Sequence, residues 1–194
     1  DVSTTLAVGA GTDLRVLRSI PWPHSLGHFY SAMTGFLGFA MLDGEYKMMG
    51  LAPYGSPDYL PFIRQNILLT DAPGSYRLNG DLLDYHAALK KQFHPKLLEA
   101  FGSPRLSDDA PFTERHRQIA ASAQAAFEEV VGDMASWAFQ QGGKRTNVAI
   151  AGGCGLNCSA NGKLLRDGPF TRMYVPPAPH DAGCAVGAAL LLHH

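Results

Sequence analysis

The chain lacks the features that would point to a membrane or to a strongly charged partner. None of its apolar runs approaches eighteen residues and its N-terminus carries no signal-peptide pattern, so we expect a cytoplasmic protein without membrane contact. Its formal net charge is only −1, from 16 Lys and Arg against 17 Asp and Glu. Because this balance produces no strong overall field, nucleic acid is not an expected partner, and any anion must be bound locally.

Cysteine is also scarce, with three residues in the chain, all near its C-terminal end. Cys154 and Cys158 are spaced C-x3-C, and no second pair of cysteines or histidines lies within reach, which argues against structural zinc. We expect these two residues and Cys184 to be small, buried and unreactive, because unpaired cysteine is among the most buried residue types.

The remaining composition predicts one compact domain, since 46% of the 194 residues are hydrophobic, and the order of the expected strands and helices along the chain predicts an α/β fold. Two short apolar runs at 4–8 and 14–20, joined by Gly-Ala-Gly-Thr-Asp, predict a hairpin. Residues 24–36 carry apolar side chains at helical spacing, and residues 43–55 indicate a short helix followed by a loop.

A long helix is predicted from Thr113 to about Gln140, with apolar residues every three or four positions and Gly142 at its end. Before it, residues 56–111 contain six prolines that interrupt short apolar patches. We therefore expect an irregular insertion there, with one small hairpin over 76–83 that turns at Asn79 and Gly80.

The C-terminal part contains two strand–turn–helix units. Residues 147–150 and 173–175 form the predicted strands, and helices follow near 157 and over 182–192. Successive units of this kind pair their strands in parallel, with ligands beyond the carboxyl ends of the strands. We therefore expect a ligand site at the two turns.

The first turn holds Gly152 and Gly153, and Asn157 stands at the start of its helix. One interpretation is a backbone cradle for nucleotide phosphates, to which the Asn157 side chain adds a hydrogen bond. The other is that a sharp turn needs glycine and that Asn157 caps the helix. The residues alone leave both open, because neither the Walker spacing nor G-x-G-x-x-G is present.

The second turn holds Asp181, which is suited to bind a metal ion or a hydroxyl group. His24 and His28 are a weaker metal candidate, because the Glu of H-E-x-x-H does not accompany them.

Glu45 and Lys47, in GEYKMMGLAPYG, are a third candidate group. A Lys neutralises phosphate and a Glu binds ribose hydroxyls, although such a pair in a loop is more often a set of solvated charges. The apolar Met48 and Met49 beside them favour the functional interpretation.

These segments make the chain resemble the O-carbamoyltransferases of the nodulation-protein and antibiotic-tailoring type. Four blocks occur in the order of that family, and they cover most of the candidate residues. They are PHSLGHFYSAMTGFLGF at 23–39, GEYKMMGLAPYG at 44–55, AGGCGLNCSANGKLL at 151–165 and PPAPHDAGCAVGAAL at 176–190.

The resemblance implies a fold and a reaction. The fold is an RNase H-like subdomain of the actin-like ATPase and sugar-kinase superfamily, with a mixed sheet and flanking helices, and residues 1–194 form the second half of that domain. The reaction transfers a carbamoyl group from carbamoyladenylate, made from carbamoyl phosphate and ATP, to an acceptor hydroxyl.

The resemblance also assigns residues. Gly152, Gly153 and Asn157 would contact the nucleotide, and Glu45 and Lys47 would lie on its ribose and phosphate side. Asp181 would be a ligand of a divalent metal ion, whether iron, zinc, magnesium or manganese.

Members of that family are longer, with an upstream half that carries an H-x-x-x-H metal pair and with a separate adenylating domain. We therefore expect a fragment that is inactive by itself. Its expected partners are the upstream half and the adenylating domain of the same protein, together with a nucleotide and a small-molecule acceptor. Two alternatives to a transferase are a non-catalytic nucleotide-binding module of the actin-like superfamily and a scaffold fragment without affinity for nucleotide.

Overall fold

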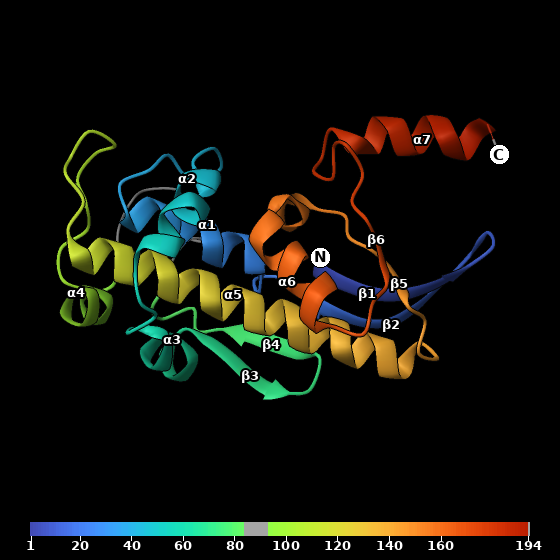
Figure 1. The fold of residues 1–194 in the computed structure, drawn as a ribbon, viewed down its shortest axis with the longest axis horizontal. Helices are drawn as coiled ribbons and strands as arrows, with labels where there is room; N and C mark the ends of the chain where they lie inside the picture. Colours follow the sequence, from blue (N-terminus) through green and yellow to red (C-terminus); the bar gives the residue numbers. More distant parts are fainter. Residues whose placement is uncertain (84–92, 194) are drawn as a thin grey trace.

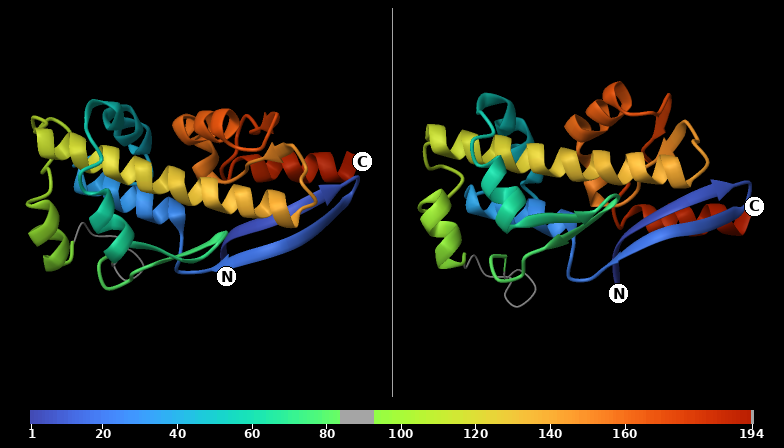
Figure 2. Two further views of the ribbon diagram at one scale, coloured as in Figure 1. Left: turned by 60° about the horizontal axis from the view of Figure 1, so that its bottom comes forward. Right: turned by 90° about the horizontal axis from the view of Figure 1, so that it is seen from below.

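One helix of 28 residues, α5 (Glu114–Gln141), runs through the molecule, and most other elements pack on it (Figure 1). The computed structural model describes residues 1–83 and 93–193. Figure 2 shows that the later helix α6 and the hairpin β3–β4 lie on opposite sides of α5. The long helix is thus the common support of segments that are far apart in sequence.

The start of α5 follows from its capping residues. The Thr113 side chain accepts a hydrogen bond from the His116 backbone N–H, and His116 Nδ1 accepts one from the Thr113 N–H. This reciprocal pair is a capping box in which His takes the usual place of Glu. The predicted apolar positions are buried, among them Ile119, Phe127 and Met134, except Trp137, which is half-buried, and Gly142 is the C-cap. The prediction of this helix is confirmed.

The predicted N-terminal hairpin and helix are also confirmed. Strands β1 (Val2–Ala10) and β2 (Asp13–Pro21) pair antiparallel, and Arg18 of β2 lies over the Trp137 ring of α5 at 3.9 Å. Helix α1 (Leu26–Phe36) follows and packs on α5, with a Tyr30–Phe127 ring contact at 5.1 Å. Next come α2 (Glu45–Leu51) and a 3-10 turn, η1 (Ala52–Tyr54).

The segment 56–111 is more regular than its prolines predict. It contains α3 (Leu60–Asn66), the antiparallel strands β3 (Leu68–Ala72) and β4 (Ser75–Leu78), and α4 (Pro95–Phe101). Several of its apolar side chains lie in the same core as α1 and α5 and have zero exposure: Ile63, Ile67, Leu97 and Phe101.

The predicted position of the small hairpin is wrong. The chain turns at Pro73 and Gly74, where Gly74 has φ +68°, rather than at Asn79 and Gly80. Asn79 follows β4 and ends it, because its backbone N–H donates to the Ile67 carbonyl and its side chain donates to the Asn66 carbonyl. Residues 84–92 of the predicted insertion lie outside the described residues.

The predicted parallel pair of strands is confirmed. Strands β5 (Asn147–Ala149) and β6 (Arg172–Tyr174) pair in parallel, and between them lie a 3-10 turn, η2 (Gly153–Leu156), and α6 (Cys158–Asp167). A single mixed sheet is not observed, because the described strands pair only as β1–β2, β3–β4 and β5–β6. The α/β class is therefore correct, and the RNase H-like fold stays a prediction.

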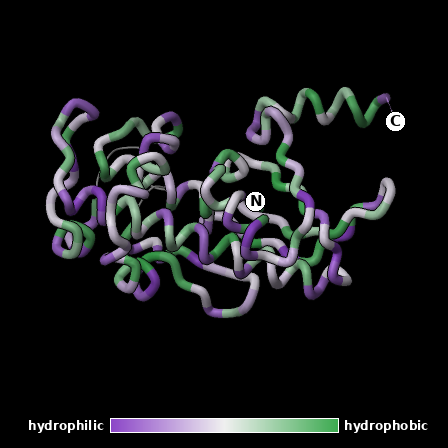
Figure 3. The backbone as a smooth tube through the Cα atoms, viewed as in Figure 1, coloured by the Kyte–Doolittle hydropathy of each residue, from purple (hydrophilic) through white to green (hydrophobic). Residues whose placement is uncertain are grey.

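The C-terminal helix α7 (Gly183–His193) begins within one residue of its predicted start and stands away from the rest of the chain (Figure 1). None of its described residues is buried, although its sequence, GCAVGAALLLH, is mostly apolar (Figure 3). A helix that is apolar on every side is typical of the interior of a large protein or of a membrane. Within residues 1–83 and 93–193, no helix combines the length and apolar character that crossing a membrane requires.

Two glycine substitutions test the role of α5 as the support of the fold. A Cβ at Gly132, inside α5, meets no other atom within 4 Å. Gly132→Ala should therefore raise the free energy of unfolding by about 1 kcal/mol, since alanine favours a helix more than glycine does. Gly55→Ala should lower it by about 1–3 kcal/mol, because a Cβ there collides with the Arg117 carbonyl of α5. Urea titration followed by circular dichroism measures both, and equal effects would contradict this packing.

Candidate functional site

The two turns that the sequence singles out lie side by side. The backbone N–H of Ile150 donates to the Tyr174 carbonyl at 3.0 Å, which extends the β5–β6 contact beyond the strands. The N–H of Gly152 then donates to the carbonyl of Pro179 at 2.5 Å. Because Pro179 is two positions before Asp181, the glycine turn and the aspartate turn are held at the same end of the strand pair, as predicted.

The glycine turn is exposed and open. Gly152 has φ +96° and ψ +163°, a conformation that is nearly restricted to glycine. Gly153 has no such constraint, and a Cβ on it would meet no other atom within 4 Å. The structure therefore explains Gly152 by its backbone conformation alone, whereas nothing in the described fold requires glycine at position 153.

Asn157 is buried and caps α6, with 7% of its surface exposed. Its Oδ1 accepts from the Ala160 backbone N–H at 3.0 Å, as the capping interpretation predicts. The side chain also pairs with Gln124 of α5 through two hydrogen bonds of 3.0 Å. One Nδ2 hydrogen remains, so a contact of this side chain with a nucleotide stays a prediction.

Glu45 and Lys47 lie on α2, where both have partners within the chain. Glu45 Oε1 accepts from the Ser31 hydroxyl at 2.5 Å and from the Leu42 N–H at 2.8 Å, so it connects α1 to the start of α2. Lys47 forms an exposed ion pair with Asp108, and its hydrogen bond to that carboxylate raises the pKa of the ammonium group.

Helix α2 also approaches the start of α6. The Met49 Sδ atom lies 3.8 Å from Cys158 Sγ, next to Asn157. The structure thus places the element that carries Glu45 and Lys47 beside the glycine turn, although the partners of these two side chains, Ser31, Leu42 and Asp108, lie elsewhere.

Asp181 is exposed at the start of α7. Among residues 1–83 and 93–193, no three His, Cys, Asp or Glu side chains are grouped so that they could hold a metal ion. The residues present therefore do not form a metal site by themselves. His24 has a structural contact instead, because its Nδ1 accepts from the Leu78 N–H at 3.1 Å.

The prediction for the cysteines is correct for one residue of three. Cys154 is partly buried, and burial raises the pKa of its thiol to about 11, so it is protonated at neutral pH. Cys158 and Cys184 are exposed, so the expectation of burial was wrong for them. Both flank the turns, where small residues border open space rather than the core.

Sequence reasoning missed a buried polar network beneath the glycine turn. Gln124 and Glu128 lie four residues apart on α5 and join Tyr30 of α1 to Asn157 and Ser159 of α6. The available signal was Gln124 itself, a polar residue next to Ala123 on the buried face of the long helix.

A shallow hollow of about 200 Å³ lies beside this network. Gln124, Glu128 and Ser159 line its polar side, and Met49, Ala52 and Pro53 are among the residues on its apolar side. It lies between η1, α5 and α6, and it brings solvent close to the start of α6.

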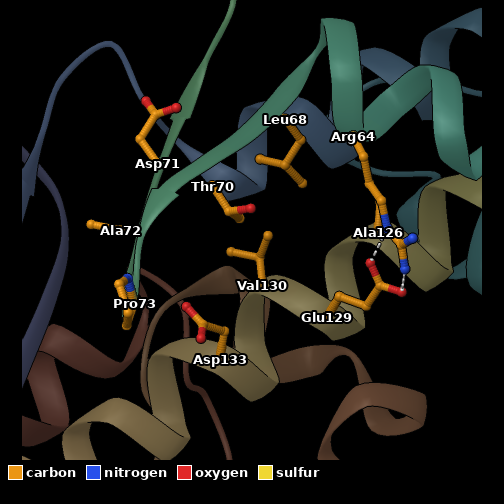
Figure 4. A pocket seen from close by; sticks show the side chains of 10 residues that line it. All are labelled: Arg64, Leu68, Thr70, Asp71, Ala72, Pro73, Ala126, Glu129, Val130 and Asp133. Atoms are coloured by element: carbon orange, nitrogen blue, oxygen red, sulfur yellow. Dashed lines mark hydrogen bonds and ion pairs between the residues drawn. The ribbon is translucent and has the colours of Figure 1, made fainter.

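A larger cavity of about 440 Å³ lies on another side of α5, against β3 (Figure 4). Its charged residues already have partners. Arg64 binds Glu129 through two hydrogen bonds, and Asp133 accepts from the Gly74 N–H at 2.6 Å. Its floor is formed by apolar side chains such as Leu68 and Val130. Because its charged groups already have partners, this cavity is a weaker candidate than the paired turns.

Comparison with known proteins gives a consistent result. Residues 2–190 match the family model described as carbamoyltransferase N-terminus. The chain is 42% identical to nodulation protein NolO of Bradyrhizobium diazoefficiens and 40% identical to nodulation protein NolNO of Sinorhizobium fredii, in each case over 98% of the length of the present chain. It is 27% identical, over 91% of its length, to the 3'-hydroxymethylcephem-O-carbamoyltransferase of Streptomyces clavuligerus. The chain spans 32%, 26% and 32% of these relatives, respectively.

The two glycines of the turn should respond differently to alanine. Gly152→Ala forces an unfavourable backbone conformation and should lower the free energy of unfolding by about 1–3 kcal/mol. Gly153→Ala should leave it within about 0.5 kcal/mol of the unsubstituted protein, because its Cβ meets nothing. Urea titration distinguishes the two, and a large loss for Gly153→Ala would show that position 153 is needed by the fold.

Proposed function

The chain belongs to the carbamoyltransferase family whose N-terminal part it matches, and we propose that the full-length protein transfers a carbamoyl group to the hydroxyl of a small-molecule acceptor. The observation that carries this proposal is the match over residues 2–190, together with a relative whose name is an O-carbamoyltransferase. Such a relative favours transfer over the alternative of a non-catalytic nucleotide-binding module.

The proposed donor is carbamoyladenylate, made from carbamoyl phosphate and ATP elsewhere in the full-length protein. The acceptor oxygen attacks the carbamoyl carbon, a new C–O bond forms, and the bond between that carbon and the phosphate oxygen breaks. AMP leaves with the electron pair, and the hydroxyl proton passes to water or to a base. The task of this chain is to hold the adenylate phosphate as its negative charge increases.

The glycine turn suits that task. The turn lies between the carboxyl end of β5 and the start of α6, where the positive end of the helix dipole favours an anion. Gly152 and Gly153 would allow a phosphate to approach the backbone, and Asn157 fixes the first turn of α6. No covalent nucleophile is required, which agrees with the raised pKa of Cys154.

We assign Glu45 and Lys47 to the ribose and phosphate side of the nucleotide. The ion pair between Lys47 and Asp108 does not prevent this, because exposed pairs contribute little to stability. Lys47 would exchange Asp108 for a phosphate oxygen at small cost, and Glu45 holds α2 in place through Ser31.

Asp181 is proposed as one ligand of a divalent metal ion, whether iron, zinc, magnesium or manganese. Hard divalent ions need several ligands, and the described residues offer no complete set, so the other ligands would come from the rest of the protein. We also propose that the upstream half and an adenylating domain complete the site and that this chain alone is inactive. The exposed apolar surface of α7 supports this proposal, because another segment of the full-length protein would cover it.

The metal assignment can be tested with Asp181→Ala in the full-length protein. We expect loss of carbamoyl transfer by at least about 100-fold, assayed with carbamoyl phosphate, ATP and a panel of sugar and antibiotic hydroxyls. Metal content measured by mass spectrometry should also fall. Asp167→Ala, at the exposed end of α6, is the matched control and should change neither. Full activity of Asp181→Ala would refute the assignment.

The nucleotide assignment can be tested with Gly153→Ala. Its added methyl group projects into open space at the turn, so we expect the affinity for a non-hydrolysable ATP analogue to fall by about 10-fold with little change in stability. Titration calorimetry of the full-length protein measures the affinity. Gly132→Ala, in α5, controls for the substitution, and equal affinities of the two variants would exclude contact of the nucleotide at position 153.

A further inference from the structure

The amide of Gln124 uses all of its hydrogen-bonding capacity in the protein interior. Its Oε1 accepts from the Tyr30 hydroxyl at 2.6 Å and from Asn157 Nδ2 at 3.0 Å. Its Nε2 donates to Glu128 Oε1 at 2.7 Å and to Asn157 Oδ1 at 3.0 Å. Gln124 is only 5% exposed, so these are the contacts that satisfy it.

Glu128 sets the direction of this network. A carboxylate only accepts hydrogen bonds, so the Gln124 amide must present its NH₂ group to Glu128 and its oxygen to Tyr30. The same orientation makes Asn157 donate from Nδ2 to Gln124, which leaves Asn157 Oδ1 to accept from Ala160. Glu128, which only accepts, and the Ala160 N–H, which only donates, therefore require the same orientation of the Gln124–Asn157 pair.

Glu128 remains charged because its own contacts favour that state. Burial alone would raise the pKa of its carboxyl group, but hydrogen bonds from Gln124, Ser159 and Lys163 outweigh burial and lower it. Lys163 Nζ lies 3.2 Å from Glu128 Oε2 and balances the charge from α6. The network thus joins α1 and α5 to Asn157 at the start of α6 and to two more residues of α6, Ser159 and Lys163.

The network ends at the glycine turn. Asn157 follows η2 directly, and its backbone N–H donates to the Cys154 carbonyl at 3.1 Å, inside the turn. A change in the orientation of Asn157 would therefore alter both the cap of α6 and the position of the N–H groups that precede it. Gly152 and Gly153 are exposed, and a Cβ on either would meet no other atom within 4 Å, whereas Gly155 is buried and Cys154 packs against the core.

We propose that Gln124 is a positioning residue of the nucleotide site: through its paired bonds with Asn157, and with its amide oriented by Glu128, it holds the Gly152–Leu156 backbone in the geometry that binds phosphate. Tyr30 supports Gln124 from α1. This inference rests on the proposed function, because it assumes that the turn binds a nucleotide.

The isosteric substitution Gln124→Glu tests this role. At pH 7.5 the new carboxylate would face Glu128 and the oxygen of Asn157, and neither can donate to it. Burial and the Glu128 charge would raise its pKa, so it would gain a proton at lower pH and could again donate to Glu128. The other titratable or charged groups near it are Lys163 on α6, Tyr30 on α1, Cys154 in the turn and Glu45 on α2.

The measurement is the dissociation constant of the full-length protein for a non-hydrolysable ATP analogue, at pH 7.5 and at pH 5.5. We expect Gln124→Glu to weaken binding by about 10–100-fold at pH 7.5 and to recover most of that loss at pH 5.5. Circular dichroism melts at both pH values monitor folding. Gln118→Glu is the matched control, because Gln118 also lies on α5 and donates to a carboxylate, that of Asp58, at 2.7 Å, away from α6. It should change affinity by less than about twofold at either pH.

Each outcome decides a separate point. If the unsubstituted protein binds no analogue, the proposed function fails and this inference fails with it. If it binds and Gln124→Glu binds equally well at pH 7.5, or loses the same affinity at both pH values, only the positioning role is refuted. If Gln124→Glu does not fold at pH 7.5, Tyr30→Phe decides the point: it removes one hydrogen bond from Gln124 and should weaken binding by about threefold, and unchanged binding would refute the role.

Discussion

The fold depends on the burial of several sides of one long helix. The other elements are too small to be stable alone, since each sheet has two strands and α2, α3 and α4 have seven residues each. Helices α1, α2, α3 and α6 become stable by packing on α5, whose buried residues Ile119, Ser122 and Gln124 lie on different sides of it. The capping box at Thr113 fixes where this support begins, and therefore which residues of α5 meet each partner.

This arrangement also explains why polar groups occur inside the molecule near the candidate site. Helix α6 meets α5 at its N-terminal end, where the free backbone N–H groups of a helix need acceptors. Asn157 supplies one acceptor but is itself buried, so its amide must be satisfied in turn, and Gln124 does so. The need to satisfy a buried cap thus extends from α6 through α5 to Tyr30, and it makes the geometry of the exposed turn depend on residues in the core.

Local patterns predicted the elements whose sequence period is clear. The hairpin β1–β2, helix α5 and the parallel pair β5–β6 follow from alternation, helical spacing and glycine positions, and the residues of the glycine turn follow from its place after a strand. Two choices depended on contacts that no local pattern contains. Pro73-Gly74 and Asn79-Gly80 are both turn sequences, and the position of Gly74 against Trp137 of α5 distinguishes them. Likewise, the position of Gln124 beside Ala123 indicates a buried polar residue, but no local pattern identifies its partners Tyr30 and Asn157, which lie on other elements.

The aspartate turn and the glycine turn differ in how firmly the chain holds them. The glycine turn is tied to the core through Asn157 and Gln124, whereas Asp181 has α7 on its far side, and α7 packs none of its apolar residues in the described part of the chain. The bond between Gly152 and Pro179 connects the two turns, but it ends two residues before Asp181. On the proposed function, any segment that covers α7 would therefore also determine where the Asp181 carboxylate lies. Assembly of the full-length protein and completion of the metal site would then be one event, because the same helix takes part in both.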